Sequence, residues 1–213
     1  MGRTKHKKIV EVNTLANVFN PRNNDDENCL RKYFQNNNEI ILEIGCGHGD
    51  YTIALANENK EKNFVGVDLK GARIWVGAKT ALSNNLTNAA FLMMNSEVLA
   101  DFFKTEKVEE IIIPFPDPHI RRTSESRRLI SPNFIGIYRS ILKKEGTIHL
   151  KTDNTHLFEY AVKVLESERA RILFGTDDLY SLAEMPFYSG IQTKYEKHYL
   201  TEGRKIKYLV FKL

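Results

Sequence analysis

The chain has 213 residues, of which 42% are hydrophobic and 27% are charged, and its net charge is +4. This length suits one domain built around a sheet, and no apolar run reaches the roughly 20 residues that a membrane-spanning helix needs. A charged start with no apolar segment of signal-peptide length behind it predicts a cytoplasmic protein, and two cysteines with six scattered histidines exclude a zinc cage and predict no bound metal.

The N-terminal segment differs in composition from the rest of the chain. It is rich in asparagine, carries basic residues between positions 3 and 8, and has one helical pattern near Asn28–Phe34. We therefore predict a basic, partly flexible N-terminal arm over residues 1–38 and a single folded domain over residues 39–213.

From residue 39 onward, strand patterns alternate with helix patterns. This alternation predicts an α/β fold, namely a Rossmann-like, doubly wound, mostly parallel seven-stranded sheet with helices on both faces. The last strand, at about Lys205–Lys212, is expected to run antiparallel. The other expected strands lie at 40–44, 63–68, 89–94, 108–113 and 146–152, and the expected helices at 51–59, 71–86, 132–142 and 157–167.

Polar side chains collect where the predicted strands end. Glu43 lies within the first strand, and Asp68, Asn95, Asp117 and Asp153 lie at or just after later ones. Because the carboxyl ends of parallel strands meet at one edge of a sheet, we expect this edge to be the active face.

The first strand leads into glycines at every second position, Gly45, Gly47 and Gly49, which permit a sharp turn and a close approach to a ligand. This spacing differs from the Gly-x-Gly-x-x-Gly of dinucleotide sites, and a carboxylate at Glu43 would repel phosphate. S-adenosylmethionine, which carries a cationic sulfonium, therefore fits better than a dinucleotide, and a methyltransferase is favoured over a dehydrogenase.

The ends of the next two strands are predicted to bind the same cofactor. Asp68 is placed to accept hydrogen bonds from the two ribose hydroxyls. Asn95 and Ser96 follow the third strand and are expected to contact the adenine.

Later segments carry a resemblance to a known family. These segments are Pro114-Phe115-Pro116-Asp117-Pro118, a basic loop ending in Arg127-Arg128-Leu129, Leu150-Lys151-Thr152-Asp153 and Thr193-Lys194-Tyr195-Glu196. Together with the glycine strand they resemble the tRNA (guanine-N7-)-methyltransferases, over most of the chain. The resemblance implies that Asp117 is catalytic and lies beside the cofactor. It also implies substrate-binding roles for Arg121, Asp153, Thr193, Lys194, Tyr195 and Glu196.

The loop after Asp117 is predicted to contact RNA, because guanidinium groups and hydroxyls suit phosphate oxygens. Affinity for tRNA should then fall steeply with salt concentration. The expected RNA contacts are Thr123, Ser124, Glu125, Ser126, Arg127 and Arg128.

Several positions depart from the usual pattern of the family, among them Arg121 and Arg122 in place of lysines, Ser124 in place of a histidine, and three at the predicted site. His119 stands where the family has Trp, Asp68 where it has Glu, and Asn95 where it has Asp. Each substitute keeps a ring that can stack on a base or an oxygen that can accept a hydrogen bond.

We therefore predict an enzyme that transfers the methyl group of S-adenosylmethionine to N7 of a guanine in the variable loop of tRNA. It is expected to act as a monomer or homodimer, with no metal and no membrane. Two alternatives stay open: a nucleic-acid methyltransferase acting on an exocyclic amine (N2 or N6), and a non-catalytic RNA-binding protein with the same fold.

Overall fold

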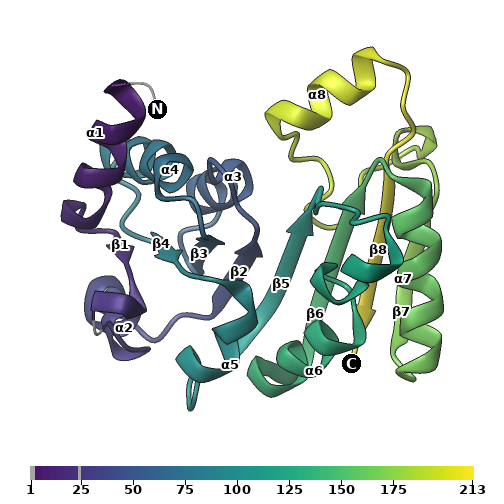
Figure 1. The fold of residues 1–213 in the computed structure, drawn as a ribbon, viewed down its shortest axis with the longest axis horizontal. Helices are drawn as coiled ribbons and strands as arrows, with labels where there is room; N and C mark the ends of the chain where they lie inside the picture. The colour runs from purple at the N-terminus through teal and green to yellow at the C-terminus, as the bar shows by residue number, and fades with distance from the viewer. Residues whose placement is uncertain (1–2, 24) are drawn as a thin grey trace. The chain divides into compact units, whose positions relative to one another are not determined.

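The computed structural model describes residues 3–23 and 25–213, and the chain divides into two compact units. The first unit ends at Glu109, and the second runs from Glu110 to Leu213. Strands alternate with helices in both units (Figure 1). None of the helices within the described ranges is long and apolar enough to cross a membrane.

The first unit contains four parallel strands in the order β1-β4-β3-β2. Every residue of β2 is buried, as expected for a parallel strand that is covered on both faces. The strands are β1 (Val18–Phe19), β2 (Ile40–Ile44), β3 (Asn63–Asp68) and β4 (Ala89–Met93).

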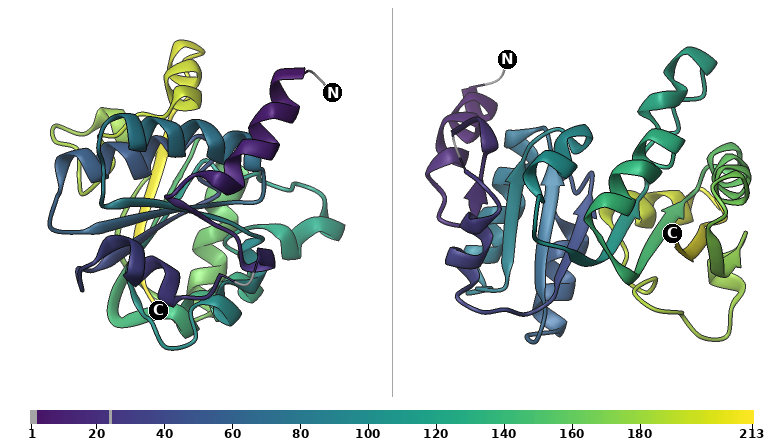
Figure 2. Two further views of the ribbon diagram at one scale, coloured as in Figure 1. Left: turned by 90° about the vertical axis from the view of Figure 1, so that its left-hand side faces the viewer. Right: turned by 90° about the horizontal axis from the view of Figure 1, so that it is seen from below.

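Helices lie on both sides of these strands, as the left panel of Figure 2 shows. Helix α4 buries Ile74, Ala78 and Ala81 along one face, the spacing expected of an amphipathic helix. The helices of the unit are α1 (Arg3–Glu11), α2 (Asn28–Phe34), α3 (Asp50–Glu58), α4 (Gly71–Ser83) and α5 (Leu99–Phe102), with short 3₁₀ turns η1 (Val12–Thr14), η2 (Pro21–Asn23) and η3 (Ser96–Val98).

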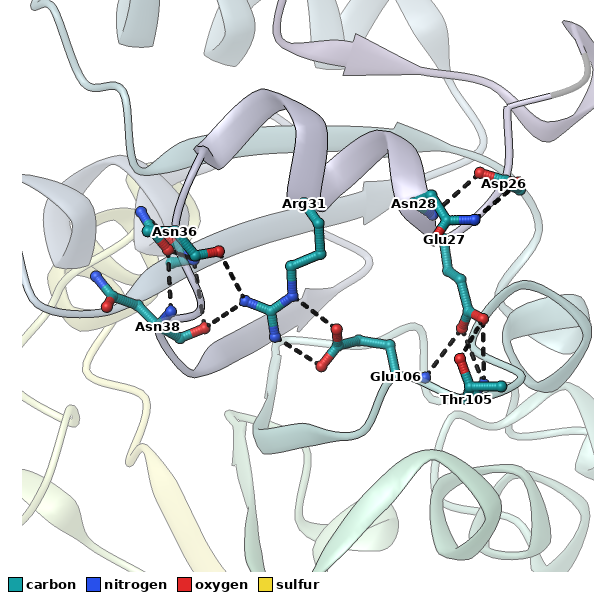
Figure 3. A network of polar contacts seen from close by, with 9 residues as sticks. Asp26, Glu27, Asn28, Arg31, Asn36, Asn38, Thr105 and Glu106 are labelled. Carbon is teal, nitrogen blue, oxygen red and sulfur yellow. Dashed lines mark hydrogen bonds and ion pairs between the residues drawn. The ribbon is translucent and has the colours of Figure 1, made fainter.

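A polar network attaches α2 to the segment that contains Thr105 and Glu106, at the end of the first unit (Figure 3). The Arg31 guanidinium donates to both carboxylate oxygens of Glu106 at 2.7 Å, and also to the carbonyls of Asn36 and Asn38. Glu27 accepts from the backbone N–H of Glu106 at 3.0 Å. The helix predicted at Asn28–Phe34 is confirmed, while the division into an arm and a domain stays a prediction.

The second unit contains three complete strands and all but the first two residues of β5, in the order β5-β6-β8-β7. Strand β8 is antiparallel to both of its neighbours, which confirms the prediction for the last strand. The strands are β5 (Val108–Pro114), β6 (Leu142–Thr152), β7 (Arg171–Thr176) and β8 (Lys207–Lys212).

The predicted number of seven strands is wrong, because the described residues form eight. We attribute the difference to β1, a strand of only two residues whose Val18 and Phe19 pair with Phe91 and Leu92 of β4. A strand this short leaves no alternating pattern in the sequence, and it lies in the segment that composition marks as an arm.

Helices α6 and α7 pack on β6, and Figure 1 shows α8 beyond the arrowheads of β5 and β6. An apolar cluster of Leu179, Ile206, Tyr208 and Val210 supports this end of the unit, and Phe115 packs against it. The helices are α6 (Pro132–Ile141), α7 (Thr155–Ser167) and α8 (Lys194–Thr201), with 3₁₀ segments η4 (Arg122–Arg127) and η5 (Leu179–Ser181).

Candidate active site

The glycine loop follows β2 and turns back toward the end of β3. Gly45, Gly47 and Gly49 have φ angles of 73°, 56° and 72°, which lie in the left-handed region that residues with a Cβ rarely adopt. The backbone N–H groups of Gly45 and Cys46 both donate to the carbonyl of Val67, at 2.8 and 2.9 Å. The loop is therefore fastened to the strand that carries Asp68.

Two of the glycines differ in what surrounds them. A Cβ on Gly49 would lie 2.6 Å from the Phe91 ring, so packing as well as conformation requires glycine there. A Cβ on Gly47 would meet nothing within 4 Å. Gly47 thus presents bare backbone to open space, which fits the close approach of a ligand.

Asp68 lies half-buried at the end of β3, and two backbone groups fix its carboxylate. Oδ2 accepts from the N–H of Gly47 at 3.0 Å, and Oδ1 accepts from the N–H of Lys70 at 2.7 Å. Each oxygen keeps a further lone pair, so the carboxylate can still accept hydrogen bonds from a diol.

Glu43 lies beneath the loop and is only 4% exposed. Its Oε2 accepts from the backbone N–H of Thr52 at 2.8 Å and from the Thr52 hydroxyl at 2.6 Å. Burial raises the pKa of Glu43 to about 8. The group is therefore mostly protonated at pH 7, which weakens the charge argument by which the sequence favoured a cationic ligand.

The residues after β4 combine polar and apolar surface. Asn95 is exposed and caps η3, with Oδ1 accepting from the N–H of Glu97 at 3.2 Å, and Ser96 is half-buried. Leu69 and Val98 are exposed apolar residues just after β3 and within η3. A few polar groups beside apolar surface suit a purine ring.

In the second unit, Asp117 lies in a strained turn after β5. Phe115 and His119 have φ angles of 50° and 40°, and a non-glycine residue in this region costs about 1–3 kcal/mol. The Asp117 side chain is exposed, and no hydrogen bond or ion pair links it to another described residue. The turn therefore presents a carboxylate that the fold itself does not use.

Contacts before and after Asp117 hold this turn. The backbone N–H of Phe115 donates to the carbonyl of Lys151 at 2.7 Å, and the Phe115 ring lies 5.7 Å from the Tyr199 ring. On the other side, Arg128 donates to the carbonyls of Pro118 and His119.

The basic loop forms the 3₁₀ segment η4, and its arginines fall into two groups. Arg121, Arg122 and Arg127 are exposed, as are Thr123 and Ser126, whereas Ser124 and Glu125 are half-buried. Arg128 is 4% exposed. Only the exposed arginines have guanidinium groups free to reach a phosphate without leaving a buried position.

The segment Thr193-Lys194-Tyr195-Glu196 begins α8. Thr193 is its N-cap, and the Thr193 hydroxyl accepts from the N–H of Glu196 at 3.1 Å. Lys194 and Tyr195 are exposed, whereas the Glu196 side chain is completely buried.

Glu196 pairs with Lys151, whose Nζ lies 2.6 Å from Oε1, and Tyr180 donates its hydroxyl hydrogen to the same oxygen at 2.8 Å. Burial raises the pKa of Glu196 and lowers that of Lys151, and the attraction between their charges opposes both shifts. The other oxygen, Oε2, is buried with no hydrogen-bond partner among the described residues.

Asp153, at the end of β6, pairs with Arg204 at 2.8 Å and is 17% exposed. It directly follows strand β6, which contains Lys151, and the Lys151 carbonyl holds the Asp117 turn. Asp153, the turn and the start of α8 thus belong to one unit and share Lys151 as an anchor.

Two residues of this arrangement escaped the sequence-based site prediction. The prediction includes Lys151 only as part of the motif Leu150-Lys151-Thr152-Asp153, with no role of its own, and does not include Tyr180. A lysine within a predicted buried strand is a usable signal, because a buried ammonium requires a carboxylate partner. Tyr180 offers no comparable signal.

Within residues 3–23 and 25–213, no group of three or more His, Cys, Asp or Glu side chains is placed to hold a metal ion.

Solved structures share this fold at low sequence identity. The chain matches a 16S rRNA methyltransferase with a TM-score of 0.63 and 13% identity, covering 86% of this chain and 90% of that one. It matches an antibiotic-related methyltransferase with a TM-score of 0.64 and 18% identity, covering 88% of this chain and 93% of that one. These structures share a Rossmann-like fold with this chain, which confirms the predicted fold class apart from the strand count.

Sequence comparison narrows the class. A family model described as "Putative methyltransferase" matches residues 37–209. The tRNA (guanine-N(7)-)-methyltransferase of Christiangramia forsetii is 42% identical over 92% of this chain and 87% of its own length. The enzyme of the same name from Cytophaga hutchinsonii is 38% identical over 99% of this chain and 98% of its own length. The chain belongs to the tRNA (guanine-N(7)-)-methyltransferase family.

Proposed function

We propose that this protein transfers the methyl group of S-adenosylmethionine to N7 of a guanine in the variable loop of tRNA. The observation that supports this most is the exposed, unpartnered carboxylate of Asp117 in a strained turn between two prolines. Membership of the family supports the choice of substrate. We further propose that the protein works in the cytoplasm as a monomer or homodimer.

The first unit supplies groups that fit the cofactor. The bare backbone at Gly47 gives room for close contact, the fixed carboxylate of Asp68 suits the ribose hydroxyls, and Asn95 with Ser96 suits the adenine. When bound, S-adenosylmethionine supplies an electrophilic methyl group. Glu43 acts mainly on the start of α3 through Thr52, and so positions the loop.

Asp117 would act by alignment and charge. Guanine N7 has an in-plane lone pair, so its methylation needs no general base to remove a proton. A carboxylate can accept hydrogen bonds from guanine N1–H and N2–H₂, and it stabilises the positive charge that develops on the purine. Holding two reactants in the required geometry can lower a barrier by roughly 7–11 kcal/mol.

The remainder of the second unit would bind the RNA. Asp153, Thr193, Lys194 and Tyr195 lie near the residues that hold the Asp117 turn, whereas the completely buried Glu196 would position the start of α8 through its pair with Lys151. The exposed guanidinium groups of Arg121, Arg122 and Arg127 suit phosphate oxygens.

Product identification tests the proposal. The protein is incubated with methyl-labelled cofactor and unmodified tRNA, the RNA is digested to nucleosides, and the labelled nucleoside is identified. We expect 7-methylguanosine. Label in an N2- or N6-methylated nucleoside would support the exocyclic-amine alternative, and no label at all would support a non-catalytic RNA-binding protein.

A further inference from the structure

One arginine of the basic loop is buried, although it stands in the same basic stretch of sequence as the exposed arginines. Arg128 is 4% exposed, and its guanidinium carbon lies 4.1 Å from the centre of the Tyr160 ring of α7. This stacking favours a planar guanidinium over an ammonium group. Arg127, the preceding residue, is exposed.

The donors of Arg128 are directed at the backbone that follows Asp117. Nε donates to the carbonyls of Pro118 at 3.1 Å and His119 at 3.2 Å. Nη2 donates to the carbonyls of His119 at 3.1 Å and Ile120 at 3.4 Å. One guanidinium thus gathers three successive carbonyls, which a single lysine ammonium cannot match in geometry.

These contacts act where the backbone is strained. His119 has a left-handed backbone conformation, and its carbonyl accepts two of the hydrogen bonds from Arg128. Phe115, the other left-handed residue, is held by the Lys151 carbonyl. Asp117 lies between these two attachments and has none of its own, so its position depends on them.

We propose that Arg128 is a positioning residue, which holds the turn so that Asp117 meets the guanine, and that it does not contact RNA phosphate. The inference rests on the proposed function of Asp117. The two adjacent arginines then have different roles: Arg127 would bind RNA, whereas Arg128 would hold the geometry of the turn. It also replaces the sequence-based prediction of an RNA contact for Arg128.

The test variant is Arg128→Lys, which keeps the charge and removes the planar fork. We expect kcat to fall roughly 10–100-fold, since a displacement of about 1 Å can cost 10²-fold. The dependence of tRNA affinity on salt should match the wild type. In Arg127→Ala, by contrast, the slope of log affinity against log salt should shrink by about one.

The matched control is Arg139→Lys in α6. Arg139 also donates to a backbone carbonyl, that of Glu168 at 2.6 Å, and to the Glu168 carboxylate at 2.7 Å. It lies outside the proposed machinery, so its replacement should leave kcat unchanged. A kcat loss shared by both lysine variants would mean general destabilisation, and would overturn a specific role for Arg128.

Hydrogen exchange gives a readout that needs no turnover. The Phe115 amide, which donates to the Lys151 carbonyl, should exchange faster in Arg128→Lys than in the wild type, and at the wild-type rate in Arg139→Lys. If Arg128→Lys does not fold, Tyr160→Leu removes the stacking ring and leaves the arginine. It should lower kcat in the same direction by a smaller factor.

The outcomes separate the inference from the proposed function. If the wild type forms no 7-methylguanosine, the proposed function fails, whatever the exchange rates are. If the wild type is active but Arg128→Lys keeps the wild-type kcat, keeps the wild-type exchange rate at Phe115 or flattens the salt dependence, the inference is wrong.

Discussion

The glycine loop of the first unit and the Asp117 turn of the second reach left-handed backbone conformations with different types of residue. Both reverse the chain at the end of a strand, and both use left-handed residues to do so. In the glycine loop these residues are glycines, which adopt that conformation without strain. In the Asp117 turn they are Phe115 and His119, for which it is unfavourable.

The difference determines what each segment depends on. The glycine loop is fastened by its own backbone to the neighbouring strand and packs on Phe91. The Asp117 turn needs the Lys151 carbonyl and the Arg128 guanidinium, which come from other parts of the second unit. The cofactor-binding loop thus adopts its backbone conformation without strain, whereas the turn that presents the carboxylate needs side-chain and backbone contacts that offset its strain.

The largest expected effect follows the removal of that carboxylate. Asp117→Ala should lower the single-turnover rate by about 10²–10³-fold, the usual loss when a group that stabilises transition-state charge is deleted. Stability should not change, because the side chain is exposed and unpartnered. Asp177→Ala, another exposed aspartate of the second unit, is the control. A wild-type rate in Asp117→Ala would show that the Asp117 carboxylate takes no part in catalysis.

The glycine loop can be broken by a single methyl group. Gly49→Ala should lower the free energy of unfolding by about 2–4 kcal/mol, because φ is 72° and the new Cβ would lie 2.6 Å from Phe91. Gly136→Ala, within α6 and with nothing within 4 Å, should instead raise it by about 0.4–1 kcal/mol. Urea titrations measure both, and a shift in the same direction would contradict the packing described.

The effect expected of Glu43 is smaller when it is taken per unit of pH. Its pKa is about 8 in the folded protein, against 4.5 for an ordinary glutamate, so the folded state holds a proton that the unfolded state releases. The free energy of unfolding should therefore fall as pH rises from about 4.5 to about 8, by at most about 1.4 kcal/mol per unit. Glu43→Gln should lack this component. Parallel pH profiles for the two proteins would show that Glu43 is ionised in the fold.

The sequence predicts those parts of the fold that long, regular patterns encode. The buried run Ile40–Ile44 and the helix at Asn28–Phe34 are found at the expected residues. Strand β1 is too short to leave a pattern, and it forms only because β4 offers it a partner. Its prediction needs the tertiary structure.

The candidate site shows the same limit. An arginine-rich loop indicates solvent exposure and phosphate binding, and this description fits Arg121, Arg122 and Arg127. Arg128 is buried because Tyr160, far along the chain, covers its guanidinium. Glu196 is likewise buried by its pairing with Lys151. Local composition cannot reveal partners that the fold supplies.

The central claim is that the Asp117 turn serves a methyl transfer to guanine N7. It is tested most directly with a tRNA whose variable-loop guanine is replaced by 7-deazaguanine, which has a C–H group in place of N7 and therefore no lone pair to accept the methyl group. The account predicts wild-type affinity for this tRNA and no methyl transfer to it. Transfer at the wild-type rate to the substituted nucleoside would contradict the account.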